Sequence, residues 1–212
     1  RTLVSASPAS TFSLDYYTDL ALTKVKSDVV QPEANLQIEY TPKRKTVGYG
    51  VERNEVDNPF TRVFFNYSRG YKGFMNGDFS YNKFQIYYNQ PIIIGAIGRT
   101  NLITELGKTY GKVPLGLLSV VPGNQTYFTI ENTFNNLKFY EFVTDEYATV
   151  QWIHNFQGKL FARIPLLRKL NWREIIGAKG VYGTVSDENR AINASGLAYN
   201  APEKFYWECS AG

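Results

Sequence analysis

The sequence has very few of the residues that build disulfides, metal sites and nucleophilic centres. Among its 212 residues it has one cysteine, Cys209, and one histidine, His154. This excludes an internal disulfide and the usual zinc sites, which need about four Cys or His ligands. We expect no cofactor and no metal. Cys209 follows Trp207 on the same face of a predicted strand, where a small buried or lipid-facing apolar side chain fits.

Long apolar runs are missing as well. A membrane-crossing helix needs about 20 mostly apolar residues. The longest run here, around 92–94, is short and is interrupted by Gly95 and Gly98. The chain begins at Arg1 without a signal peptide and ends inside a predicted strand at Gly212, so we expect a longer protein at both ends.

Neither sign of charge is concentrated along the chain. The net charge is +4 and the pI is about 9.0, yet Lys and Arg are scattered, with one dense cluster at 43–45. Proteins that bind nucleic acids gather their basic residues on one face. We interpret the cluster, which follows Pro42, as a solvated turn and expect no nucleic-acid partner.

Aromatic residues are abundant, at 16% of the chain, and apolar and polar residues alternate in strand-length segments. The segments are 11–22, 33–40, 60–69, 83–89, 99–106, 147–156, 172–182 and 205–210. Successive side chains of a strand point to opposite faces, so each segment has one apolar and one polar face. The predicted fold class is all-β, without a domain boundary and with one short helical turn near 164–170, opened by Pro165.

Three features favour a transmembrane antiparallel β-barrel over a soluble β-sandwich, which would alternate as well. Several segments approach the roughly 9 to 11 residues of membrane-crossing strands. Aromatic residues stand near strand ends, as in the girdles of such barrels. The second faces carry charges, including Arg62, Arg99, Glu105 and Arg173, which a sandwich core would leave unpaired and a wet lumen accepts. We expect residues 1–212 to be an incomplete portion of one larger barrel.

Two predicted connections fit a barrel. Asn76, Gly77 and Asp78 predict a tight turn between two strands. Residues 108–145 lack clean alternation and predict one long loop. Such a loop is unusual in a compact soluble domain but common on one side of an outer-membrane barrel.

The residues that could carry chemistry do not form a convincing catalytic pattern. Some outer-membrane lipases have a serine two residues after the histidine, but Phe156 stands there. We expect His154, beside Trp152, to be an interfacial ring on the lipid side. Glu141, Asp145 and Glu146 near the end of the loop would suit acid–base work only if their environments separated their pKa values. We interpret them as a solvated or lumen-facing cluster and expect the protein not to be an enzyme.

Five stretches carry a resemblance to a known family: FFNYSRGYKG, ELGKTYGKVPLGLL, PGNQTYF, FNNLKFYEFVTDEYATV and IPLLRKLNWREIIGAKGVYG. In this order and spacing, from about Phe60 to Asn189, they resemble outer-membrane barrels of the Bacteroidota. That family has no known function and usually follows a carboxypeptidase-regulatory-like domain. Residues 1–59 and 190–212 fit as generic barrel strands.

That family is in turn similar to the assembly and translocation barrels of the BamA and TamA type. In the BamA type, a long extracellular loop folds back into the lumen through an Arg-Gly-aromatic motif. By position, the loop corresponds to about 123–145 of this chain. The sequence LKFY stands there at 137–140, and RGY at 69–71 lies too early. The missing motif argues against an inward-folded loop and against insertase activity.

We therefore predict a non-enzymatic integral barrel of the bacterial outer membrane that acts as an envelope transport or assembly component, or as a scaffold. Its partners would be the lipid or lipopolysaccharide of that membrane and other envelope proteins. The alternatives are a soluble β-rich binding module and a barrel enzyme that uses Glu141 or Asp145. The candidate loop and lumen residues are Asn124, Phe134, Asn135, Tyr140, Glu141, Phe142, Asp145 and Arg173.

Overall fold

The computed structural model describes most of the chain. The described residues are 2–5, 15–18, 23–51, 53–56, 59–95, 97–124, 126, 130, 132–138, 140–170, 172–194 and 200–212, with the backbone alone for 2–5 and 55. Most of the strand predicted over 11–22 lies outside these residues. Within it, β2 (Tyr16–Tyr17) pairs with β3 (Val25–Lys26).

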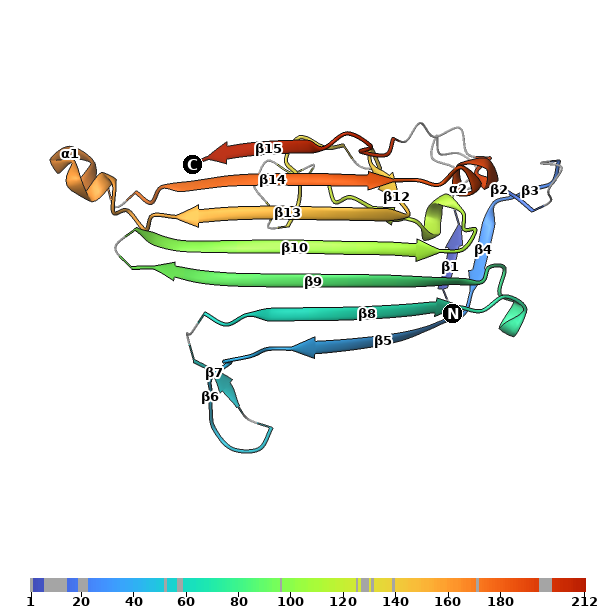
Figure 1. Cartoon of the computed structure of the whole chain (residues 1–212), viewed down its shortest axis with the longest axis horizontal. Helices are drawn as coiled ribbons and strands as arrows, with labels where there is room; N and C mark the ends of the chain where they lie inside the picture. The colour runs from blue at the N-terminus through green and yellow to red at the C-terminus, as the bar shows by residue number, and fades with distance from the viewer. Residues whose placement is uncertain are drawn as a thin grey trace.

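A seven-stranded antiparallel sheet dominates the structure (Figure 1). Its order is β15-β14-β13-β10-β9-β8-β5. The strands are β5 (Glu33–Tyr40), β8 (Arg62–Gly70), β9 (Tyr81–Ile94), β10 (Gly98–Tyr110), β13 (Glu146–Asn155), β14 (Ile175–Thr184) and β15 (Tyr206–Ala211). The prediction of a mostly β fold is confirmed. Within the described residues the sheet stays open, with β5 and β15 at its edges.

The remaining elements are short. Three further strand pairs join β1 (Thr2–Ser5) to β4 (Asp28–Gln31), β6 (Thr46–Val47) to β7 (Asn54–Glu55), and β11 (Ser119–Val120) to β12 (Val143–Thr144). The helical turns are η1 (Phe74–Asn76), η2 (Leu115–Leu117), η3 (Phe161–Arg163), α1 (Pro165–Arg168) and α2 (Asp187–Ile192). The helical turn opened by Pro165 is confirmed, whereas α2 was not predicted. No helix in the described part of the chain is long and apolar enough to cross a membrane.

The register aligns the apolar faces of all seven strands. One row of cross-strand partners runs Tyr40, Val63, Tyr88, Thr104, Val150, Gly180 and Trp207. The row beside it runs Ile38, Phe65, Ile86, Leu106, Ala148 and Tyr182. Because directly paired residues share a face and a one-residue slip would reverse it, the strands form one continuous surface. We call the face that carries these rows the apolar face.

The apolar face is largely uncovered. Ile38 is 52% exposed, and Tyr40 and Trp207 are each 65% exposed. Other exposed members are Leu36, Phe84, Ile86, Ile92, Ile94, Leu106, Tyr110, Val150 and Tyr182. Within the seven strands, the charged side chains on this face are Arg69, Lys108 and Glu146. All three lie where the connections 71–80 and 111–145 emerge, which we call the loop end.

The opposite, polar face carries charges and close tyrosine–glycine contacts. Its charged positions are Glu33, Glu39, Arg62, Lys83, Arg99, Glu105, Lys179 and Glu208. Gly107 pairs with Tyr147, and a Cβ at Gly107 would approach that ring to 2.2 Å. The Tyr147 hydroxyl can therefore lie across Gly107 and donate a hydrogen bond to Glu105 Oε1 at 2.5 Å. Glycine is needed here because any side chain would displace the ring.

The connection between β8 and β9 corrects a predicted turn. Residues 76–78 do not form a tight two-residue turn, because the chain leaves the sheet after Gly70 and returns at Tyr81. The connection instead contains η1, with Met75 at φ 46° and Asn76 at φ 61°. These left-handed residues carry the chain around a wider path, which places Asp78 beside the N-terminal strands.

Candidate functional site: the loop on the polar face

The long loop packs on the polar face of β14 and β15. Phe134 is fully buried and clusters with Val121, Leu137 and Val181 of β14. Phe142 and Tyr206 of β15 pack against this cluster, with their ring centroids 5.4 Å apart. In Figure 1 the yellow segments overlap β13, β14 and β15 in the view. The missing Arg-Gly motif argued against a loop that folds inward, yet this loop does pack on the polar face of the sheet.

Two buried, oppositely charged residues of the sheet hold the loop. Lys179 and Glu208 are cross-strand partners on the polar face. The Lys179 ammonium donates a hydrogen bond to the carbonyl of Thr133 at 2.6 Å. The Glu208 carboxylate accepts hydrogen bonds from the backbone N–H groups of Asn135 at 2.8 Å and Asn136 at 2.9 Å. Charge-assisted hydrogen bonds from these two side chains to backbone groups thus anchor the loop to the sheet.

Asp145 fixes the end of the loop. Its buried carboxylate accepts hydrogen bonds from Ser186 N–H at 2.8 Å and from the Asn189 amide at 3.0 Å. The Asn189 side-chain oxygen accepts one from Val113 N–H at 2.9 Å, near the start of the loop. Asn189 thus ties both ends of the loop to α2, a helix that the sequence did not predict.

The other candidate loop residues serve the loop's own conformation. Asn124 Oδ1 accepts hydrogen bonds from the N–H and hydroxyl of Thr126. Tyr140 has a left-handed φ of 58° and packs against a neighbouring buried cluster. The Glu141 carboxylate accepts a hydrogen bond from Lys138 N–H at 2.8 Å. Glu141 and Asp145 thus bind different backbone partners, and no shared hydrogen bond joins them into an acid–base pair.

Arg173 does not join this site. The strand predicted from residue 172 begins at Ile175, so Arg173 precedes it in the connection between β13 and β14. Its side chain is exposed at the end of the sheet opposite the loop end, and it lines a hollow with Trp172. The prediction that the strand already includes Arg173 is therefore wrong.

His154 lies on the apolar face, as its spacing of two residues from Trp152 in β13 indicates, but it is covered. It is only 3% exposed, and its Nδ1 lies 2.6 Å from the Thr100 hydroxyl oxygen. Its ring centroid lies 6.1 Å from that of Trp152 and 4.4 Å from that of Phe156. Neighbouring rings, rather than an open surface, surround it. Cys209 is exposed, and the described side chains contain no group of three His, Cys, Asp or Glu residues that could hold a metal ion.

A family comparison covers six of the seven strands of the sheet, from β5 to β14. The C-terminal domain of a family of unknown function (DUF5686) matches residues 28–189. The chain belongs to this family. The DUF5686 domain begins at β4, well before the Phe60 from which the resemblance was drawn, and it includes Lys179 but not Glu208. No curated protein and no solved structure matches the chain.

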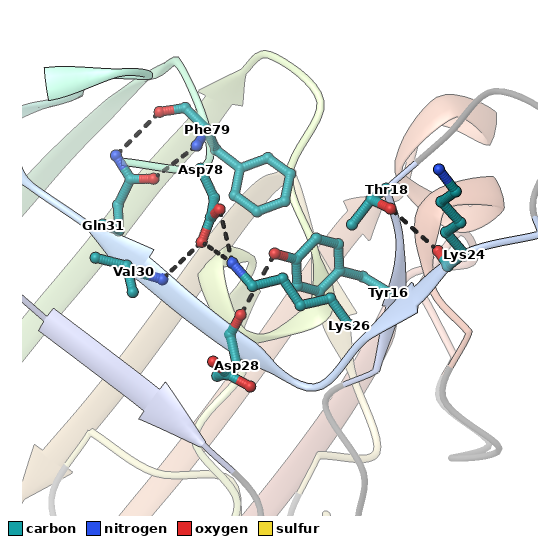
Figure 2. A network of polar contacts seen from close by, with 9 residues as sticks. All are labelled: Tyr16, Thr18, Lys24, Lys26, Asp28, Val30, Gln31, Asp78 and Phe79. Carbon is teal, nitrogen blue, oxygen red and sulfur yellow. Dashed lines mark hydrogen bonds and ion pairs between the residues drawn. The ribbon is translucent and has the colours of Figure 1, made fainter. Parts of the chain in front are cut away.

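At the loop end, a polar network joins the start of the DUF5686 domain to the connection 71–80. Figure 2 shows Asp78 at its centre, with Lys26 and Val30 pointing toward it. The Asp78 carboxylate accepts hydrogen bonds from Lys26 Nζ at 2.8 and 2.9 Å and from Val30 N–H at 2.8 Å. The Gln31 side chain bonds both the N–H and the carbonyl of Phe79, each at 3.0 Å. Asp78 and Phe79 also line a hollow of about 670 Å³.

Hydrogen bonding sets the ionisation of this network. Burial alone would raise the pKa of Asp78, but the hydrogen bonds from Lys26 and Val30 outweigh it and lower the pKa below the usual 3.8. The hydrogen bond to Asp78 raises the pKa of Lys26 above the usual 10.5, although burial opposes it. Burial raises the pKa of the Tyr16 hydroxyl. The carboxylate and the ammonium are therefore both charged at neutral pH.

The Asp78 network predicts acid sensitivity at β4. Because the folded-state pKa of Asp78 is lowered, its stabilising contribution is full above about pH 4 and is lost as the pH falls through that lower pKa. We expect the opening free energy at the Val30 amide to fall by about 1 kcal/mol across this range. The opening free energy is measured by hydrogen exchange of the Val30 amide, with each rate corrected for the intrinsic exchange rate at that pH. In Asp78→Asn the opening free energy should be low already at neutral pH and no longer fall with acid; an unchanged acid response would contradict the assignment.

Proposed function

We propose that the DUF5686 domain forms part of the wall of an outer-membrane β-barrel, in which the apolar face contacts lipid. The supporting observation is the register, which joins exposed apolar side chains from β5 to β15 into one surface. Monomeric soluble proteins rarely expose an apolar surface that extends across a whole sheet. Lipid is the solvent that makes such a surface favourable.

The height of the apolar face supports this proposal. The stretch from Phe84 to Ile94 covers roughly 33 Å at a rise of about 3.3 Å per residue. Tilted by about 40°, as strands of outer-membrane barrels are, it spans about 25 Å, which is the usual height of the lipid-facing band. Lys108 and Glu146, which form an exposed ion pair at 2.6 Å, lie at the loop end of this band. Charges at the boundary and none along the middle suit a membrane-crossing sheet.

The position of the long loop supports a role for this sheet in the envelope. The loop lies on the polar face, where a barrel has its lumen, and Lys179, Glu208 and Asp145 fix it through backbone and amide partners. A loop held in this way narrows a lumen or presents a fixed surface within it. We therefore propose a non-enzymatic envelope transport or assembly component, or a scaffold for other envelope proteins, in the bacterial outer membrane.

Single-cysteine labels on adjacent residues of β5 test the lipid contact. In a Cys209→Ser background, Ile38→Cys carries a spin label on the apolar face and Gln37→Cys carries one on the polar face. Both positions are exposed, so neither substitution disturbs a packed core. In the full-length protein in bilayers, we expect the Ile38 label to collide with oxygen and the Gln37 label with a water-soluble nickel chelate.

The outcomes separate the membrane wall from a soluble binding module. Equal access of the nickel chelate to both labels would overturn the proposal. A folded full-length protein that stays monodisperse in water without detergent would do the same. In both cases the exposed aromatic side chains would instead form a binding surface for a ligand or protein.

A further inference from the structure

The connection between β13 and β14 contains the whole net charge of the chain. Residues 156–174 include five cations, Lys159, Arg163, Arg168, Lys169 and Arg173, and one anion, Glu174. Their net charge of +4 equals that of all 212 residues. The rest of the chain is balanced, with 18 Lys and Arg (23 less 5) and 18 Asp and Glu (19 less 1). We call residues 156–174 the basic connection.

The same connection exposes large apolar side chains. Leu166 of α1 is 78% exposed and Trp172 is 57% exposed. Leu160, Ile164 and Leu170 are exposed as well. Apolar and basic side chains thus share one short segment. This combination is typical of segments that lie at the boundary between membrane and water.

The one acidic residue of the connection is used internally. Glu174 is buried, and its carboxylate accepts a hydrogen bond from Phe161 N–H. Its carbonyl accepts a second one from Phe156 N–H at 2.9 Å. Lys159 Nζ donates to the carbonyl of Gly95 at 2.9 Å, which ties the connection to the turn between β9 and β10. The base of the connection is thus fixed to the sheet. Glu174 bonds backbone groups and forms no ion pair with the five cations among the described residues.

The four arginine and lysine side chains beyond Lys159 have no carboxylate partner within the described residues. They are Arg163, Arg168, Lys169 and Arg173. Arg168 and Arg173 line a common hollow of about 570 Å³, together with Phe161, Leu167 and Trp172. Two arginines beside aromatic and aliphatic residues suit an anionic group that is attached to an apolar chain. Guanidinium binds phosphate through paired, nearly planar hydrogen bonds.

The position of the connection fits the boundary of the proposed membrane band. Figure 1 shows α1 beyond the ends of β13 and β14, at the side of the sheet away from the loop end. Ile92 and Ile94 are exposed on the apolar face at this end, and Ile97 is exposed in the adjacent turn. The apolar surface of the sheet therefore continues toward the basic connection.

We propose that the basic connection binds the phosphate-bearing head groups of an anionic bilayer, with Arg168 and Arg173 on the phosphates and Leu166 and Trp172 in the interface. This inference rests on the proposed membrane wall and adds its lipid partner. Tryptophan is enriched at membrane boundaries, and cations near an anionic lipid surface are attracted within a Debye length. The charge of the connection selects anionic lipid over zwitterionic lipid.

A spin label at Leu166→Cys in the Cys209→Ser protein tests the proposal. The full-length protein is placed in bilayers of phosphatidylcholine alone, or of phosphatidylcholine with phosphatidylglycerol. We expect the label to enter the interface in the second bilayer and to leave it at high salt. The equilibrium constant for moving the Leu166 label from water into the interface should fall roughly thirty-fold in Arg168→Gln with Arg173→Gln. This is the change expected for the loss of two cations near an anionic surface. Arg44→Gln with Lys45→Gln removes the same charge from the connection 41–61 and should change this constant little.

The results distinguish this inference from the membrane wall itself. If the Ile38 label lies in lipid while the Leu166 label stays in water in both bilayers, the wall stands and the head-group site is refuted. If phosphatidylglycerol, salt and the two arginine substitutions leave the position of the Leu166 label unchanged, apolar contact alone holds the connection at the membrane. That result would also refute the head-group site. Protection of the Leu166 label only in native membranes, and not in purified bilayers, would identify a protein partner instead. If neither label reaches lipid, both proposals fail.

Discussion

Replacing Glu208 by alanine is expected to release the loop from the polar face. The Glu208 carboxylate is buried and accepts two backbone hydrogen bonds, from Asn135 and Asn136. Its loss also leaves the buried Lys179 ammonium without the opposite charge on the neighbouring strand. Removing one member of such an arrangement costs about 3 kcal/mol. The amide protons of Asn135 and Asn136 should then exchange roughly a hundred-fold faster.

Glu146→Ala is the matched control for this experiment. It also removes a carboxylate from a strand of the sheet, but Glu146 is exposed and pairs only with Lys108. Water already solvates that pair, so its loss should barely affect loop exchange. Glu208→Gln keeps an acceptor oxygen and should show an intermediate rate. Equal exchange rates in Glu208→Ala and Glu146→Ala would contradict the anchoring role.

Local alternation predicted the sheet well because its period is a property of each strand alone. The segment 33–40 matches β5 at both ends, and the predicted apolar side chains Ile38, Ile86 and Val150 share one face. The register between strands is not contained in any single segment. It arises from cross-strand pairs such as Gly107 and Tyr147, where the ring fits only against a glycine.

The loop site was predicted in part, since its position followed from the absence of alternation. Phe134, Asn135, Phe142 and Asp145 do come together with the sheet or α2. The anchors Lys179 and Glu208 were missed because their partners are backbone groups more than forty residues away, and backbone partners leave no side-chain pattern. A usable signal was present in Lys179, a lone cation between Gly177 and Val181 on an otherwise uncharged strand face. Arg173 was misplaced because alternation does not reveal where a strand begins.

A second large effect is expected from a charge at the middle of the apolar face. Val150 lies near the centre of that face, between Thr104 and Gly180, and is exposed. If the face contacts lipid, Val150→Arg places a guanidinium in hydrocarbon at a cost of about 2–4 kcal/mol. We expect a large loss of folded, membrane-inserted protein, measured by reversible denaturant unfolding in bilayers and by the heat-modifiable mobility of the folded form.

Position should decide how large this effect is. Tyr110 is on the same face but at the loop end, beyond Lys108 and Glu146, so Tyr110→Arg should cost only about 0–1 kcal/mol because the charge reaches water. Gln37→Arg on the polar face of β5 should be tolerated in the same way. A soluble sheet predicts a different order, since an exposed Val150 would then accept arginine as readily as Tyr110 does. Equal stabilities of Val150→Arg and Tyr110→Arg in bilayers would therefore reject the lipid-facing assignment, whereas a graded loss from Val150 to Tyr110 would map the depth of the apolar face in the membrane.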